Sequence, residues 1–292
     1  MNESGTLLQL IQENLDDFCD SRREDFSSIS PDLVPVIDYT QSLLAGGKRF
    51  RALFCYWSWV GALSTAPVRQ SEMERQASAA AMVGVSAALE MFHAAALVHD
   101  DLLDQSDTRR GAPAVHKRFE HLHSASGWAG SAERFGVAGS VLVGDLMLGW
   151  SSEIFGNALL AAPNTSIETS CRNEFSKMRV EVMAGQYLDV REAGEKEFSV
   201  ARSLRIARYK SGKYTIERPL HLGAVIASPA QSEHGQLLNV LSAYGLPLGE
   251  AFQLRDDLLG IFGDPTVTGK PAGDDLREGK RTVLMAMTLE KA

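Results

Sequence analysis

Two acidic clusters, each followed by basic residues, could hold a divalent metal ion and a phosphate group together. The first cluster is the run DDLLD at positions 100–104, with Arg109 and Arg110 just after it. The second is the Asp-Asp pair at 256–257, followed by Lys270. Carboxylates and diphosphates are both anions, so they share a site only with a cation between them, and Mg²⁺ takes oxygen ligands from both. The alternation of acidic and basic residues predicts an enzyme that acts on diphosphates.

The first acidic cluster has the spacing of a metal site at the end of a helix. Asp100 and Asp104 are four residues apart, which on a helix places both carboxylates on one face. Mg²⁺ keeps several waters and completes its octahedron with phosphate oxygens. A solvated helix end is the alternative, but the apolar run AAALV at 94–98 directly precedes the cluster. A site at the mouth of a buried region is therefore favoured.

Basic residues indicate places for two phosphate groups. The pair Arg109 and Arg110 can grip one, because a guanidinium donates two parallel hydrogen bonds to phosphate oxygens. The segment GGKRFR at 46–51 is a glycine turn that opens a helix with three cations in its first turn. Cations at a helix N-terminus oppose the helix dipole unless an anion is bound there. A bound diphosphate would supply this anion.

The second acidic pair lies inside the apolar segment FQLRDDLL at 252–259. Two consecutive aspartates in such a helix are unfavourable unless they are paired or bind metal. A glycine-rich charged segment follows at 263–280 and contains Lys270. A loop of this kind could close over a reactive intermediate and exclude water.

Helical periodicity dominates the elements that must carry these residues, and signals for strands are poor. The spacing of apolar residues predicts helices at 7–18, 33–44, 50–63, 74–103, 135–155, 167–190, 199–210, 220–227 and 237–260. Turn-forming residues predict loops at 65–67, 123–130, 162–164, 228–229 and 263–280. No linker separates two halves, so we predict an all-α fold with a single domain over residues 1–292.

The composition argues against several classes of protein. With 37 acidic and 29 basic residues, the net charge of −8 disfavours nucleic-acid binding. The apolar stretch 77–98 imitates a membrane span, but Glu90 and His93 interrupt it, so we interpret it as a buried helix and the chain as not transmembrane. Three separated cysteines and a start without a basic, apolar leader favour a reducing, cytoplasmic location.

The order and spacing of these motifs, from about position 46 to 282, resemble those of the trans-polyprenyl diphosphate synthases, the family of geranylgeranyl and farnesyl diphosphate synthases. The resemblance implies an all-α helical bundle around a deep central cavity, usually as a homodimer. It implies head-to-tail (1'-4) condensation of isopentenyl diphosphate with an allylic diphosphate, which would be dimethylallyl, geranyl or farnesyl diphosphate. Three magnesium ions would assist this reaction, and the product would be an all-trans polyprenyl diphosphate.

The resemblance also implies roles for the acidic residues. Asp100 and Asp104 would bind two magnesium ions, and Asp256 would bind the third. Asp101 and Asp257 would support them as further metal-site residues.

For the substrates, the resemblance implies three groups of residues. The allylic diphosphate would be held by Arg109, Lys210 and Lys270. The isopentenyl diphosphate site, which works without metal, would consist of Lys48, Arg51, His93 and Arg110. The polar residues at the reaction centre would be Gln186, Ser211 and Gln253. Without the resemblance, His93 would be interpreted as a hydrogen-bonded core histidine.

The expected chemistry is electrostatic. Magnesium and cationic side chains stabilise the departing diphosphate, so the allylic C–O bond ionises to a delocalised carbocation without any nucleophilic residue. The double bond of isopentenyl diphosphate then attacks this cation, and by resemblance the released diphosphate takes the proton that is lost. Oxygens at Ser211 and Gln253 would stabilise the cation, and a dry apolar cavity would protect it from water.

The length of the product should depend on what closes the cavity beneath Asp100. One turn back along the helix are Ala95 and Ala96, which are too small to block a growing chain, whereas Met91 and Phe92 lie about one turn further. We therefore expect geranylgeranyl diphosphate or a longer product.

The chain departs from the family pattern in two places. The second acidic motif commonly reads DDxxD, but Gly260 stands at the fifth position and Asp264 is the next carboxylate. Family members also usually continue for several helices beyond the position of Ala292, so truncation at this end stays open.

Two other classes of function stay open at this point. A class I terpene cyclase shares metal-triggered ionisation, but it has no use for the second set of basic residues around Lys48. A non-catalytic regulatory subunit of a prenyl synthase is the other alternative, although the intact Asp100, Asp104, Asp256 and Lys210 argue against it.

Overall fold

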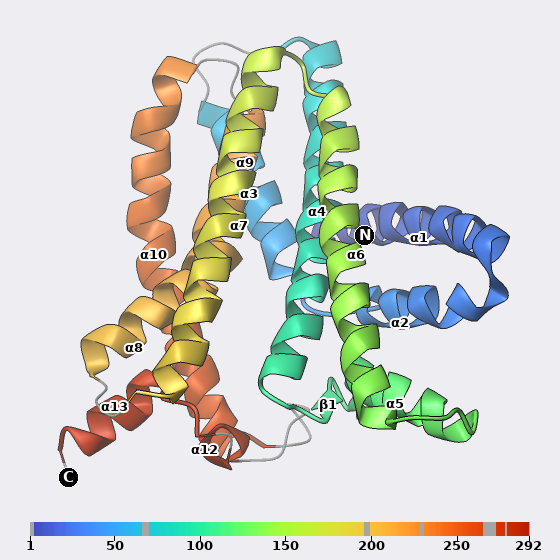
Figure 1. Cartoon of the computed structure of the whole chain (residues 1–292). Coiled ribbons are helices and arrows are strands. Elements are labelled where there is room, and N and C mark those ends of the chain that lie inside the picture. Colours follow the sequence, from blue (N-terminus) through green and yellow to red (C-terminus); the bar gives the residue numbers. More distant parts are fainter. Residues whose placement is uncertain are drawn as a thin grey trace. The chain divides into compact units, whose positions relative to one another are not determined.

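A computed structural model of the chain consists almost entirely of helices (Figure 1), which confirms the predicted all-α class. The structure describes residues 3–65, 70–195, 199–227, 231–264, 273–277 and 279–291. The chain divides into two compact units. Unit 1 comprises Met1–Leu53 and Gln70–Ala162, and unit 2 comprises Phe54–Arg69 and Pro163–Ala292. The prediction of a single domain stays a prediction.

Unit 1 is built around two long helices that run side by side. Its elements are α1 (Glu3–Ile29), the 3-10 turn η1 (Pro31–Leu33), α2 (Val34–Leu44), the start of α3 (Phe50–Thr65), α4 (Glu72–Leu103), the strands β1 (Thr108–Arg109) and β2 (Ala112–Pro113), α5 (Val115–Ala125) and α6 (Ala132–Leu160).

Small residues allow α4 and α6 to approach closely. A Cβ atom at Gly84 would lie 3.3 Å from the Cα of Ala158, so the two backbones meet there. Ser151 Oγ of α6 donates to the Ala88 carbonyl of α4 at 2.8 Å. The start of α4 is fixed by a capping box, in which Ser71 and Glu74 satisfy each other's backbone N–H groups. This close packing fixes the axis of the helix whose far end carries the first acidic cluster.

Unit 2 surrounds one short helix that is buried along its whole length. Its elements are the rest of α3, α7 (Thr165–Ala193), α8 (Val200–Ala207), the π-helix η2 (Arg208–Glu217), α9 (Arg218–Ala227), α10 (Gln231–Phe262), α12 (Asp274–Arg277) and α13 (Val283–Leu289). Every residue of α9 is buried. The helix is mostly apolar, as expected when other helices cover every side, and its first turn also carries the buried Arg218 and His221.

Two of the described helices, α4 and α6, are long and apolar enough to cross a membrane by length and composition. In α4, 78% of the apolar window is buried inside the protein, as expected for a core helix; in α6 the share is 39%.

The predicted helices are all present, with four differences in detail. The segment 115–125 forms α5, so the expected loop at 123–130 begins only after Ala125. The predicted helix 199–210 is α8 followed by a π-helix that runs on into α9. The expected loop at 263–280 contains the short helix α12, and the β1–β2 pair was not predicted. The loop positions 66–67, 228–229 and 265–272 lie outside the described residues.

Candidate active site

The C-terminal end of α4 presents the first acidic cluster. Asp104 is the C-cap of the helix, and its N–H donates to the Asp100 carbonyl at 2.8 Å, so the two residues stand one helical turn apart. Both carboxylates are half-buried. The spacing predicted from the sequence therefore holds, with two carboxylates on one face.

The middle aspartate of the cluster, Asp101, binds an arginine. Its side chain is buried, and Arg109 donates to Asp101 Oδ1 through Nε at 2.8 Å and through Nη2. Arg109 Nη2 also lies 3.6 Å from Asp100 Oδ2. Burial lowers the pKa of Arg109, but the hydrogen bond to Asp101 and the charges of Asp100 and Asp104 outweigh it and raise the pKa above its ordinary value. The three aspartates and Arg109 thus form one charged group.

A second group of cations surrounds His93, two turns before Asp100 on α4. Burial and then the charges of Arg51, Arg110, Arg109 and Arg49 hold the pKa of His93 well below its ordinary value. The imidazole is therefore neutral and is surrounded by guanidinium groups. Such a cluster suits an anion with several oxygens. The structure brings together His93, Arg51 and Arg110, three of the four residues of the predicted isopentenyl diphosphate site.

The loop before α3 reaches this group through an unusual backbone. Gly46 and Gly47 have φ of 99° and 98°, and Arg49 has φ of 52°. A Cβ at Gly47 would lie 2.9 Å from Arg110 Nη2, so a larger residue would displace this guanidinium, and the positive φ also favours glycine. Arg110 Nη1 donates to the Leu43 carbonyl at 3.1 Å, at the C-terminal end of α2. The loop and Arg110 therefore support each other.

Arg49 anchors the loop from inside. Its buried side chain lies 3.5 Å from Glu90 Oε2, and its Nη2 donates to Gln12 and to the Leu44 carbonyl. Glu90 also accepts a bond from the Ala52 N–H at 3.3 Å. Sequence reasoning treated Glu90 only as an interruption of an apolar helix and missed this role. The fourth predicted residue, Lys48, is exposed, with Nζ 5.9 Å from the centroid of the Phe50 ring.

Unit 2 brings another set of predicted residues together where α7 meets the π-helix η2. Lys210 Nζ lies 2.5 Å from Asp189 Oδ2. Gly185 lets the helices touch, because a Cβ there would lie 2.6 Å from the Tyr209 carbonyl carbon. Gln186 follows Gly185 on α7, and half-buried Ser211 follows Lys210 on η2. Asp189 was missed, although it lies three residues after Gln186 and so on the same face of a helix.

The second acidic pair lies on α10. Asp257 is buried and accepts a hydrogen bond from Gln253 Nε2 at 2.8 Å, whereas Asp256 is exposed. The Gly260 carbonyl, at the position where an aspartate is usual, accepts a bond from the Gly273 N–H at 3.0 Å. Lys270 lies outside the described residues.

Within the described part of the chain, no three or more Asp, Glu, His or Cys side chains are gathered as ligands of one metal ion. The donors available in unit 1 are the carboxylates of Asp100 and Asp104. This sparse all-oxygen set does not suit a structural zinc site, and it fits Mg²⁺, which keeps water ligands and shares phosphate oxygens with a substrate.

Comparison with known proteins shows the family to which the chain belongs. Residues 34–292 match the family model described as Polyprenyl synthetase. The chain is 30% identical to the geranylfarnesyl diphosphate synthase of Aeropyrum pernix over 268 residues, which cover 92% of this chain and 74% of the relative. It is 31% identical to the geranylgeranyl diphosphate synthase of Sulfolobus acidocaldarius over 209 residues, which cover 70% of this chain and only 55% of that relative.

A solved structure is similar over nearly the whole chain. The geranylgeranyl pyrophosphate synthase of Corynebacterium glutamicum, complexed with isoprenyl diphosphate and magnesium, has a TM-score of 0.87 and 39% sequence identity, and the match covers 98% of this chain and 76% of that one. The structural neighbour thus shares the all-α fold, and the family match covers the acidic clusters and the basic segment at 46–51. The chain belongs to the polyprenyl synthetase family, whose named members here are prenyltransferases.

Proposed function

We propose that this chain condenses isopentenyl diphosphate head-to-tail (1'-4) with an allylic diphosphate, and that the product is an all-trans polyprenyl diphosphate. The observation that carries the proposal is the presence of two anion-binding groups in unit 1. One group combines Arg109 with the carboxylates of Asp100 and Asp104, and the other surrounds His93 with arginines, of which Arg49 pairs with Glu90. An elongating synthase binds two diphosphates, one with metal and one without, whereas a terpene cyclase binds a single one.

Magnesium is the proposed metal. The similar Corynebacterium protein carries it in its crystal structure, and the half-buried carboxylates at the end of α4 are suitable oxygen donors. We assign two ions to Asp100 and Asp104 and a third to Asp256. Bound magnesium would offset the charge of the leaving diphosphate. Asp101 would act through Arg109, which it holds beside Asp100, and Asp257 would act through Gln253.

The protein's own cations would hold the substrates in place. Arg109, Lys210 and Lys270 would bind the allylic diphosphate and stabilise it as its C–O bond breaks. Lys48, Arg51, His93 and Arg110 would bind isopentenyl diphosphate. The new C–C bond forms at the allylic C1, and the proton then lost from isopentenyl C2 passes to the released diphosphate. Side-chain oxygens of Gln186, Ser211 and Gln253 would face the carbocation.

The proposed product is geranylgeranyl diphosphate or longer, made from dimethylallyl, geranyl or farnesyl diphosphate. Ala95 lies five residues before Asp100 on α4 and is fully buried, as are Met91 and Phe92. The substitution Ala95→Phe should shorten the product. Identical product lengths from the wild type and the variant would show that α4 does not set the length of the product.

We also propose that the protein is a cytoplasmic homodimer. An apolar stripe on α7 is left exposed, with Val180 at 66%, Met183 at 47%, Tyr187 at 69% and Val190 at 49%. A stripe of this kind is typical of a helix that packs against another chain. All three cysteines are free and buried, as expected in a reducing compartment.

Product analysis tests the proposed reaction. The purified chain is incubated with Mg²⁺, isopentenyl diphosphate and each allylic starter in turn, and the products are identified by mass spectrometry, with Asp100→Asn as the inactive control. We expect isopentenyl diphosphate to be consumed and longer diphosphates to form. Release of a cyclic hydrocarbon without consumption of isopentenyl diphosphate would indicate a cyclase. No turnover by the chain alone, but stimulation of an active synthase, would indicate a regulatory subunit.

A further inference from the structure

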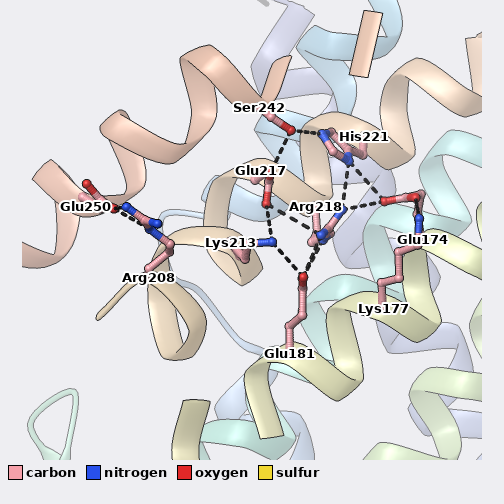
Figure 2. A network of polar contacts seen from close by, with 10 residues as sticks. All are labelled: Glu174, Lys177, Glu181, Arg208, Lys213, Glu217, Arg218, His221, Ser242 and Glu250. Carbon is pink, nitrogen blue, oxygen red and sulfur yellow. Dashed lines mark hydrogen bonds and ion pairs between the residues drawn. The ribbon is translucent and has the colours of Figure 1, made fainter. Parts of the chain in front are cut away.

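A network of charged side chains lies in unit 2, and the proposed reaction does not use it (Figure 2). Its centre is Arg218, the first residue of α9, which is 7% exposed. The guanidinium forms a bidentate pair with Glu181 of α7, through Nε to Oε2 at 2.7 Å and Nη2 to Oε1 at 2.8 Å. Its Nη1 donates to Glu174 Oε2 at 2.8 Å. Lys213 of η2 joins the same carboxylate, with Nζ 2.7 Å from Glu181 Oε1.

The network continues from the same centre to α10. His221 Nδ1 lies 3.1 Å from Glu174 Oε2, and His221 Nε2 lies 3.0 Å from Ser242 Oγ. Ser242 Oγ donates to Glu217 Oε1 at 2.6 Å. The polar contacts therefore join the last turn of η2 to α7, α9 and α10, as the dashed lines in Figure 2 show.

Stability alone does not account for so many buried charges. Taking a carboxylate and a guanidinium out of water is expensive, and buried ion pairs can often be replaced by apolar residues without loss of stability. Glu174, Glu217 and Arg218 are all less than 9% exposed. Burial opposes ionisation of Glu174, but its hydrogen bonds to His221 and Lys177 and the charge of Arg218 outweigh it and bring its pKa to about 2. The charges are therefore kept, and they specify one arrangement of the four elements.

The element held in this way is a rare one. Residues Arg208–Glu217 form a π-helix of 10 residues, whereas π-helices usually occur as single turns and often at functional sites. Two close contacts with neighbouring helices hold the π-helix from its sides. Tyr209 lies against Gly185 of α7, and a Cβ at Gly249 of α10 would lie 2.6 Å from the Gly212 Cα. Lys210 and Ser211 lie between these contacts.

We propose that Glu181 and Arg218 are positioning residues, whose bidentate pair holds residues 208–217 in the π-helical register and so directs Lys210 toward the allylic diphosphate. The proposal depends on the role of Lys210 in the proposed function. If the segment shifted by one residue into an α-helix, each side chain before the shift would turn by about 100° around the axis relative to Arg218. Lys210 would then leave Asp189, and the allylic diphosphate would lose a cation.

The test compares Glu181→Gln with Glu168→Gln. Both substitutions neutralise a glutamate of α7 that pairs with an arginine, but the Glu168–Arg172 pair is on the surface and does not contact η2. For Glu181→Gln we expect the KM for the allylic diphosphate to rise about tenfold or more, since small misplacements of binding groups have effects of this size. The KM for isopentenyl diphosphate should stay within about twofold, because its proposed residues are in the other unit. Glu168→Gln should have the same KM as the wild type for both the allylic diphosphate and isopentenyl diphosphate.

Amide hydrogen exchange gives a readout that does not depend on activity. Exchange in residues 208–217 should become faster in Glu181→Gln and stay unchanged in Glu168→Gln. Arg218→Lys serves as a second variant if Glu181→Gln does not fold, because lysine keeps the positive charge but cannot form the bidentate pair with Glu181. Unchanged amide exchange in residues 208–217 overturns the proposal that the Glu181–Arg218 pair holds the π-helix. Faster exchange with an unchanged allylic KM overturns the link to Lys210. If the wild type elongates no allylic substrate, the proposed function fails, while the exchange result still decides whether the pair holds the π-helix.

Discussion

The two units hold their cationic residues by different means. In unit 1, the residues around His93 are carried on a loop and a tight turn, where Gly46, Gly47, Arg49 and Arg110 have positive φ. In unit 2, Lys210 is carried on a distorted helix that buried ion pairs connect to its neighbours. Both units thus use buried ion pairs, such as Arg49–Glu90 in unit 1, and unit 1 relies in addition on backbone conformation. The same type of substitution should therefore have different effects in the two units.

The largest effect should come from the outer carboxylates of the first cluster. Asp100→Asn should lower kcat by about 10²–10³-fold, because it removes a charge that holds the cation opposite the leaving group. Asp101→Asn should instead raise the KM for the allylic diphosphate about tenfold, since it frees Arg109 and loses one charged hydrogen bond. Steady-state kinetics over a range of Mg²⁺ concentrations distinguish the two. An equal change in Mg²⁺ dependence for both variants would contradict the assignment of Asp101 to Arg109.

The glycine pair of unit 1 offers a matched test of backbone conformation. Gly46 and Gly47 have nearly the same φ, but a Cβ would meet nothing within 4 Å at Gly46, whereas at Gly47 it would meet Arg110. Each alanine substitution should destabilise the fold by about 1–3 kcal/mol through backbone strain. Only Gly47→Ala should also raise the KM for isopentenyl diphosphate. Urea unfolding and kinetics measure the two effects, and equal KM values would show that Arg110 moves aside freely.

Acid unfolding should reveal the buried charges of unit 2. Glu174 has a pKa of about 2 in the folded protein, lower than its ordinary value of 4.5, so its contribution is present above pH 4.5 and is lost as the pH falls toward 2. The shift corresponds to a contribution on the order of 3 kcal/mol. Glu174→Gln should be less stable than the wild type at pH 7 and should show a flatter stability curve between pH 5 and 2. If the stability of the wild type and of Glu174→Gln changed with pH in parallel, the result would argue against the ion pair between Glu174 and Arg218.

The smallest effect should be a change in proton binding at His93. Its pKa is held well below the ordinary value by burial and by four arginines, so the imidazole should be neutral at neutral pH in the free protein. Inorganic diphosphate bound among these arginines should raise this pKa, because an anion favours the charged imidazole. NMR titration of the His93 ring, assigned with His93→Asn, measures the change. A pKa that does not respond to diphosphate would place the anion elsewhere.

The sequence predicted the long helices and the position of the first acidic cluster at the end of one of them. Apolar periodicity located α4 and its acidic end, and the spacing of Asp100 and Asp104 on one face is confirmed by the structure. The helix α5 was missed because its polar residues and the turn after it obscured the apolar pair Val115 and Phe119, which are buried on one face.

Partners across the fold could not be predicted from the sequence. Nothing near Arg218 in sequence indicates that it pairs with Glu174 and Glu181, which come from another helix. The π-helix is equally hidden, because its register depends on contacts at Gly185 and Gly249. The roles of the predicted site residues themselves stay predictions until the variants above are measured.

The short β1–β2 pair places Arg109 and Arg110 next to each other, yet their side chains go to different places. Arg109 reaches Asp101, and Arg110 reaches the Leu43 carbonyl above Gly47. Arg109 is the last residue of β1, whereas Arg110 is in the following turn with φ of 53°, so this one turn of chain contributes to both substrate groups. We therefore expect the two substrates to influence each other's affinity: an occupant that shifts Arg109 also moves Arg110, and saturation with one diphosphate changes the dissociation constant of the other.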